Sequence, residues 1–166
     1  LVQVIPGKEY GVMHRQNRSE NEVVVVVKPW SDEKKPVLKE QYRKAIEDYI
    51  EPYRLINTKV TVESARYAGI CVHGKIALEQ DSPKTRKAVL ERISRELSYT
   101  ERKHPFGTVI SYGQLFTALE NTEGVKKVLE LNLERTGNAA RKNDRGDVLL
   151  DADALGILEE TDLEFC

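Results

Sequence analysis

Several features of common protein classes are missing from this sequence. It has only two cysteines, Cys71 and Cys166, too few for a disulfide framework, so we expect a reducing compartment. No apolar run approaches the roughly 18 residues that a membrane-spanning helix needs, and no stretch resembles a signal peptide. Phosphate-binding glycine loops, G-x-S-x-G and H-E-x-x-H are all absent. The sequence therefore predicts neither a membrane span nor a known catalytic motif.

Excess charge of one sign is missing as well. The chain has 26 basic and 27 acidic side chains, which gives no global attraction to nucleic acid or to anionic membranes. The two signs are nevertheless separated along the chain. The segment Lys84–Lys103 is mainly basic, whereas Asp147–Cys166 has several acidic residues and no basic one. Such separation suits either two solvated faces or docking between neighbouring subunits.

Hydrophobic periodicity predicts the main elements. Glu22–Lys28 contains five consecutive valines and predicts a buried strand. Apolar residues at helical spacing predict a helix from Leu38 to Tyr53, in which Tyr42, Tyr49 and Tyr53 share a buried stripe. Alternation predicts a strand at Ile70–Leu78, after a hairpin-like connection. Ser82 followed by Pro83 predicts the start of another helix.

The connections are predicted from composition and turn residues. Leu1–Ile5 alternates weakly and precedes a polar stretch, Lys8–Asn21, which we expect to be a loop. Thr136–Gly146 is polar and contains glycine, which also indicates a loop. Near the end, we expect strands at Val148–Leu150 and Ile157–Phe165, separated by a turn at Leu155-Gly156.

This order of elements predicts an α+β fold with a ferredoxin-like split β-α-β core, in which two long helices cover one face of a mostly antiparallel sheet. We expect residues 1–21 to be the remnant of a preceding unit and a loop. Residues 22–103 would form the ferredoxin-like β-α-β-β-α module. Residues 104–166 would add a loop, a short helix and closing strands on the same sheet.

The stretch 104–133 has the clearest signals for the start and end of a helix. Ser111 and Gln114 have the spacing of a capping box, which predicts a helix that begins after Ser111. Gly124 is placed to end this helix in a left-handed conformation. Leu129, Leu131 and Leu133 then alternate as in a half-buried strand.

Candidate reactive groups are few. Cys71 and His73 share a strand face, but two ligands do not make a structural zinc site, and a small apolar cysteine beside a surface histidine is the simpler interpretation. The acidic cluster lacks the ligand pattern of a calcium loop and is interpreted as solvated acids: Asp144, Asp147, Asp151 and Asp153. We therefore predict no catalytic, cofactor-binding or metal-binding residue.

Nucleic-acid binding is also disfavoured. The helix after Ser111 carries Glu120 and Glu123, which have the wrong charge for phosphate. No strand combines the aromatic and basic residues of an RNA-binding sheet. The helical spacing of Tyr42, Tyr49 and Tyr53 indicates core packing.

Several weak motifs occur in an order that resembles the C-terminal part of the baseplate J-like protein family, from about residue 20 to 165. The motifs are structural: Gly107, Ile110, Ser111 and Leu115; Gly124, Val125 and Val128; Leu149, Leu150, Leu155 and Gly156. The sequence departs from the family pattern at His104, where a basic or aromatic residue is usual. It also lacks the family's larger N-terminal part.

This resemblance implies a structural role in a contractile phage tail, prophage or injection machine, and no reaction or cofactor. The implied partners are copies of the same chain and other wedge and hub proteins. The implied location is the tail baseplate, after assembly in the bacterial cytoplasm. We expect subunit contacts at the turn Pro105–Gly107, the loop Thr136–Gly146 and the acidic end. The interface or structural candidates are Pro105, Phe106, Gly107, Ser111, Gln114, Gly124, Asp151, Asp153, Glu159 and Glu160.

Two other classes stay open at this point. A ferredoxin-like fold is also compatible with a regulatory module that binds a small molecule. An enzyme without a known motif is the third possibility.

Overall fold

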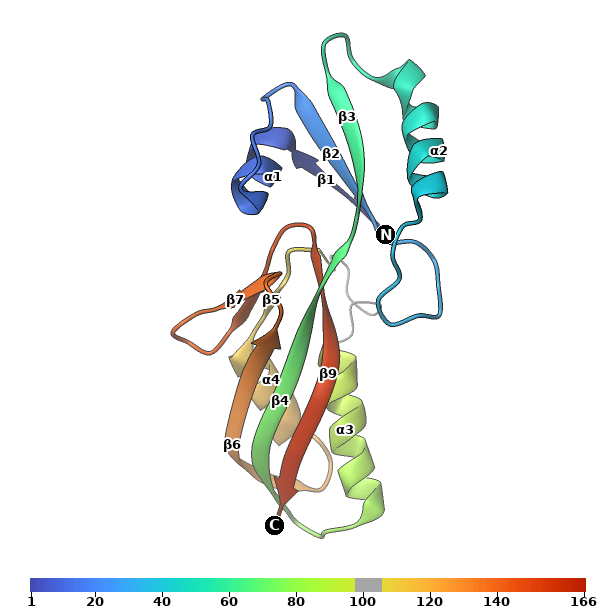
Figure 1. Cartoon of the computed structure of the whole chain (residues 1–166). Coiled ribbons are helices and arrows are strands. Elements are labelled where there is room, and N and C mark those ends of the chain that lie inside the picture. Colours follow the sequence, from blue (N-terminus) through green and yellow to red (C-terminus); the bar gives the residue numbers. More distant parts are fainter. Residues whose placement is uncertain (98–105) are drawn as a thin grey trace. The chain divides into compact units, whose positions relative to one another are not determined.

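The computed structural model describes residues 1–97 and 106–166, which divide into two compact units, Leu1–Arg66 and Tyr67–Cys166 (Figure 1). The described residues form four α-helices and three sheets of three strands, so the predicted α+β class is confirmed. The sequence had grouped residues 22–103 in one module. None of the described helices is long and apolar enough to span a membrane.

The first unit contains one small sheet with the strand order β1-β2-β3. β1 is antiparallel to β2, whereas β3 is parallel to β2. Figure 1 shows a helix on either side of this sheet. The elements are β1 (Val2–Pro6), α1 (Gly7–His14), β2 (Glu22–Val27), α2 (Glu40–Ile50), the 3-10 helix η1 (Glu51–Tyr53) and β3 (Lys59–Ser64).

α1 lies where the sequence predicted a loop, and that prediction is wrong. Tyr10 is buried on this helix, and Gly7 packs so closely on β2 that an added Cβ would lie 2.7 Å from the Cβ of Glu22. These tertiary contacts stabilise a helix whose own apolar pattern is weak.

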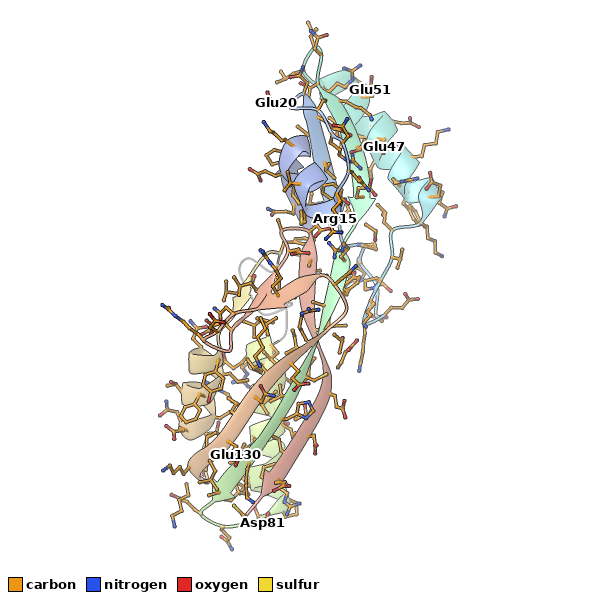
Figure 2. The ribbon with its side chains drawn as sticks, turned by 60° about the vertical axis from the view of Figure 1, so that its left-hand side comes forward. Arg15, Glu20, Glu47, Glu51, Asp81 and Glu130 are labelled. Carbon is orange, nitrogen blue, oxygen red and sulfur yellow. The ribbon has the colours of Figure 1, made fainter. Side chains whose placement is uncertain are left out.

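The predicted strand Glu22–Lys28 is confirmed as β2, and the predicted helix is confirmed as α2 followed by η1. The three tyrosines of α2 and η1, however, are not in the core. Tyr42, Tyr49 and Tyr53 are 56%, 72% and 76% exposed. α2 instead contributes Glu47, whose carboxylate accepts the backbone N–H of Val62 at 3.0 Å (Figure 2 labels Glu47). This bond satisfies a donor on the outer edge of β3, a position that otherwise favours pairing with another chain.

The second unit contains two sheets with the orders β6-β4-β9 and β5-β8-β7. Ser82 caps α3 as predicted, because its Oγ accepts the backbone N–H of Thr85 at 3.1 Å. The elements are β4 (Arg66–Leu78), α3 (Pro83–Leu97), β5 (Val109–Ile110), α4 (Tyr112–Glu120), β6 (Val125–Thr136), β7 (Ala140–Lys142), β8 (Val148–Leu150) and β9 (Ala154–Phe165).

The core of this unit lies between one face of the β6-β4-β9 sheet and the helices α3 and α4, which Figure 1 shows on the same side of the sheet. The predicted inward face of β4 is confirmed by Ile70, Val72 and Ile76, which are fully buried. Val89 and Ile93 of α3 are also fully buried and belong to the same core cluster.

The ferredoxin-like arrangement is not confirmed, because β2 and β4 belong to different sheets. The expected hairpin before Ile70 is wrong for the same reason: β3 pairs with β2, whereas β4 pairs with β6. β4 runs antiparallel to β6. Next to β9, Cys166 donates its N–H to Ile76 and accepts the N–H of Leu78, the alternating pattern of parallel strands.

Three local predictions in the second unit need correction. β7 lies inside the segment predicted as a loop at 136–146, since it pairs with β8. The predicted turn at Leu155-Gly156 lies within β9, and the chain turns at residues 152–153 instead. The register of β6 shifts opposite Lys75 and Ile76, so the alternation from Leu129 is interrupted and this side chain is 46% exposed.

Candidate interaction site

The predicted turn and the predicted acidic segment form one local structure. The N–H of Gly107 donates to the carbonyl of Ala154 at 3.2 Å, and the N–H of Leu150 donates to the carbonyl of Thr108 at 3.2 Å. The N–H of Asp151 donates to the carbonyl of Ala139 at 3.0 Å. The first two bonds fix the segment before α4 against β8 and the start of β9, and the third joins the β8–β9 turn to the residue before β7. Of the other candidates in this turn, Phe106 is half-buried, and Pro105 lies outside the described residues.

The four acidic candidates differ in what they offer to a partner. Asp153 is only 1% exposed, so its carboxylate is not available at the surface. Asp151 is half-buried, whereas Glu159 and Glu160 are exposed. Charge reversal at Asp153 would therefore test stability rather than assembly, because a buried ion without its native contacts is strongly unfavourable.

Ser111 is the N-cap of α4, as the sequence predicted. Its Oγ accepts the backbone N–H of Gln114 at 3.4 Å, and the Gln114 side chain is exposed. Gly124 has a left-handed backbone with φ of 85°, but α4 already ends at Glu120. The glycine instead begins the approach to β6, and its carbonyl accepts the N–H of Glu79 at 2.9 Å.

A second cap on α4 comes from the distant residue Asp147, which the sequence analysis interpreted as a solvated acid. Its Oδ1 accepts the backbone N–H of Tyr112 at 2.9 Å, and its Oδ2 accepts the amide of Asn143 at 3.0 Å. The Asn143 side chain in turn accepts the backbone N–H groups of Arg145 and Asp147, both at 2.9 Å. These interactions, chiefly the bond from Asn143 and then that from Tyr112, lower the pKa of Asp147.

A signal for part of this cap was present in the sequence. An asparagine four residues before an aspartate, with Gly146 between them, is typical of a side-chain-stabilised turn. The bond to Tyr112 could not be read from local spacing, since it spans 35 positions.

Cys71 and His73 lie on the face of β4 opposite the core. Burial, followed by the nearby carboxylates of Glu160, Glu159 and Glu134, raises the pKa of the Cys71 thiol. A raised pKa disfavours the thiolate that nucleophilic or metal chemistry requires. The Nδ1 atom of His73 lies 3.9 Å from a carboxylate oxygen of Asp162. Among the described residues, no group of three or more His, Cys, Asp or Glu side chains is placed to hold a metal ion.

Glu159 links the two outer strands across this same face. Its carboxylate accepts a hydrogen bond from the Thr136 hydroxyl, so β9 and β6 are joined over β4. Gly69 lies directly beneath, and a Cβ there would be 2.1 Å from the Glu159 carboxyl carbon. The close approach of this side chain therefore depends on glycine at position 69.

Comparison with known proteins gives a likeness of fold. No protein-family model matches the sequence, and no curated protein matches it. A chain in the cryo-EM structure of the anti-feeding prophage (AFP) baseplate, 6-fold symmetrised, is similar with a TM-score of 0.61 and 14% sequence identity. The two share a fold. The match covers 85% of this chain, which spans 29% of the length of the matched chain.

Proposed function

We propose that this protein is a structural component of the baseplate of a contractile phage tail, prophage or injection machine. The fold likeness to a chain of the anti-feeding prophage baseplate, over 85% of the present chain, carries the proposal. The order of motifs that resembles baseplate J-like proteins supports it independently, because that resemblance was drawn from residues rather than from the fold. The proposed role is assembly and not catalysis.

The exposed apolar side chains of the first unit support an assembly role. Trp30 and Ile56 are 97% and 91% exposed, and Tyr49 and Tyr53 add two aromatic rings whose centroids lie 5.9 Å apart. Exposed apolar and aromatic surface is typical of sites that contact other proteins. In the proposed baseplate, such surface would be covered by other wedge and hub proteins or by copies of this chain.

The proposed location is the tail baseplate of the assembled particle, reached after synthesis in the host cytoplasm. The experiment is to delete the gene from a bacterium that carries it and to purify particles by density gradient. An epitope-tagged copy should restore assembly and co-sediment with tail sheath and tube proteins. Absence of the tagged protein from particles, together with normal particles in the deletion strain, would overturn the proposal.

A regulatory module that binds a small molecule is the alternative, and a thermal-shift screen distinguishes it. A ligand at 100 times its dissociation constant stabilises a protein by about 2.7 kcal/mol. We expect no stabilisation by amino acids or nucleotides. A saturable increase in the unfolding temperature with one of them would favour the regulatory alternative.

A further inference from the structure

Among the described residues of the second unit, no helix or strand covers one face of the β6-β4-β9 sheet, since α3 and α4 both lie on the other side (Figure 1). The register places residues of β6 beside Cys71, His73 and Lys75 of β4. Contacts from β4 place β9 residues on the same face. We call this surface the open face: Cys71, His73, Lys75, Lys127, Glu130, Asn132, Glu134, Glu159, Glu160, Asp162 and Glu164.

Acidic side chains outnumber basic ones on the open face. It carries six carboxylates against two lysines, Lys75 and Lys127, and one histidine, and Lys142 reaches its edge by donating to the Asn132 side chain at 2.7 Å. Lys75 is engaged with Glu164, with Nζ and the carboxylate oxygen 3.2 Å apart, and this contact raises the pKa of Lys75. Near Cys71, the carboxylates of Glu160, Glu159 and Glu134 contribute to the raised pKa of the thiol. A neutral surface that covered the open face would desolvate its excess negative charge, whereas a positively charged surface would offset that cost.

A surface pocket takes part of its lining from the open face, with His73, Lys75, Glu130, Asn132, Asp162 and Glu164. Gly74, Leu131 and Tyr112 complete the lining. Glu130 lies on the β6 side of the sheet (Figure 2). A positively charged element, such as a helix with a basic stripe, would suit the excess negative charge of the open face.

The same unit presents such an element on its other side. α3 has five basic residues, Lys84, Arg86, Lys87, Arg92 and Arg95, against Glu91 and Glu96. Its buried residues Val89, Ile93 and Leu97 face the core. The exposed outward stripe has three basic residues and one acidic one: Lys84, Lys87, Glu91 and Arg95. Among the described residues, the Lys84 ammonium has no ion-pair partner. Lys87 has only an exposed contact with Glu91, 3.6 Å apart.

We infer that the open face binds the outward stripe of α3 from a second copy of this chain. Because the acidic surface and the basic stripe lie on opposite sides of one unit, each copy has a free acidic face after its own helix is bound. Such head-to-tail contacts repeat and generate rings or filaments. The inference rests on the proposed baseplate role and specifies which surfaces join neighbouring copies.

Two charge-reversal variants of the full chain test the inference by sedimentation equilibrium at low salt. Glu134→Lys with Glu160→Lys changes the open face, and Lys84→Glu with Lys87→Glu changes the helix. Each should weaken self-association by about tenfold or more. High salt should weaken the wild type similarly, because at 1 M the screening length is only about 3 Å. Glu120→Lys with Asp144→Lys alters exposed acids elsewhere and should associate like the wild type.

Mixing the two variants gives the decisive result. The reversed face and the reversed helix are again complementary, so an equimolar mixture should recover association that neither variant shows alone. Glu134→Gln with Glu160→Gln provides a milder change if the lysine variants lose their native circular dichroism. A monomeric wild type at low salt, or a mixture that stays dissociated, would overturn the inference. Presence of the chain in purified particles tests the proposed function separately.

Discussion

The carboxylate of Asp147 accepts the backbone N–H of Tyr112 at 2.9 Å and thereby ties the β7–β8 hairpin to the first turn of α4. A negative charge at a helix N-terminus is favourable, because the first N–H groups of a helix have no partner within it. Ser111 satisfies a second of these donors. The start of α4 therefore depends on one local cap and one distant cap.

Acid titration should reveal the distant cap. The pKa of Asp147 is lowered in the folded protein, chiefly by the side chain of Asn143 and then by Tyr112. The unfolded chain therefore binds this proton at higher pH, so the contribution is present above about pH 4 and is lost as pH falls through the lowered pKa. Asp147→Asn should lower the unfolding temperature at pH 7, and the two curves should converge in acid.

Asp144→Asn is the matched control for this measurement, since it removes an exposed carboxylate from the same hairpin. Thermal unfolding by circular dichroism at several pH values measures both variants. An Asp147→Asn deficit that is equal at all pH values would contradict the assigned electrostatic role.

Arg18 should be essential for the stability of the first unit. Its guanidinium contacts Glu22 at 2.6 Å and Glu63 at 3.1 Å, and it donates to the Thr61 hydroxyl at 2.9 Å. The Glu22 side chain is only 7% exposed, so Arg18→Met leaves a buried carboxylate with Lys59 alone, 3.5 Å away. We expect a loss of about 3 kcal/mol in the free energy of unfolding.

Urea unfolding measures this loss, and hydrogen exchange assigns it to strands β1, β2 and β3. Arg18→Met combined with Glu22→Gln should be more stable than the single variant, because the unpaired buried charge is removed. A double variant that is less stable than Arg18→Met would contradict this explanation.

Gly124 combines a left-handed backbone with a crowded site. Its φ is 85°, and an added Cβ would lie 2.7 Å from the Cγ2 atom of Thr85. Gly137 has a similar φ of 78° but no neighbouring atom within 4 Å. Gly137→Ala should therefore cost only the backbone strain, about 1–2 kcal/mol, and Gly124→Ala should cost more. Thr85→Ser, which removes Cγ2, should recover part of the difference in chemical unfolding experiments.

Equal losses at the two glycines, or no recovery by Thr85→Ser, would show that the contact with Thr85 is unimportant. The comparison is direct because both glycines lie in the second unit and both have positive φ.

The tyrosines of α2 should contribute little to folding. Tyr49 is 72% exposed, so Tyr49→Ala should change the free energy of unfolding by less than about 0.5 kcal/mol. Tyr10 is 6% exposed, and Tyr10→Ala should cost about 3–5 kcal/mol by analogy with other buried aromatics. Urea unfolding of both variants measures the contrast. A large loss at Tyr49 would support the core role that helical spacing had predicted.

Features governed by neighbouring residues were predictable from the sequence. Ser82 and Ser111 could be predicted as helix caps because a cap and the N–H group that it binds are only three residues apart in the sequence. The structure shows both hydrogen bonds. The inward face of β4 was predictable because side chains of a strand alternate, so Ile70, Val72 and Ile76 must share a face. In the candidate site, the sequence was sufficient to name the acidic residues. It did not show that Asp153 is buried whereas Glu159 and Glu160 are exposed.

The sequence by itself determined the α+β class, the run of valines as a strand and the caps of two helices, because these depend on local periodicity and short hydrogen bonds. Only the tertiary structure decided that β2 and β4 join different sheets, that Tyr49 is exposed, and that Asp147 caps α4. Each of these outcomes depends on which distant segment supplies the partner. A strand's pattern shows which side is apolar, but it does not specify which strand lies beside it.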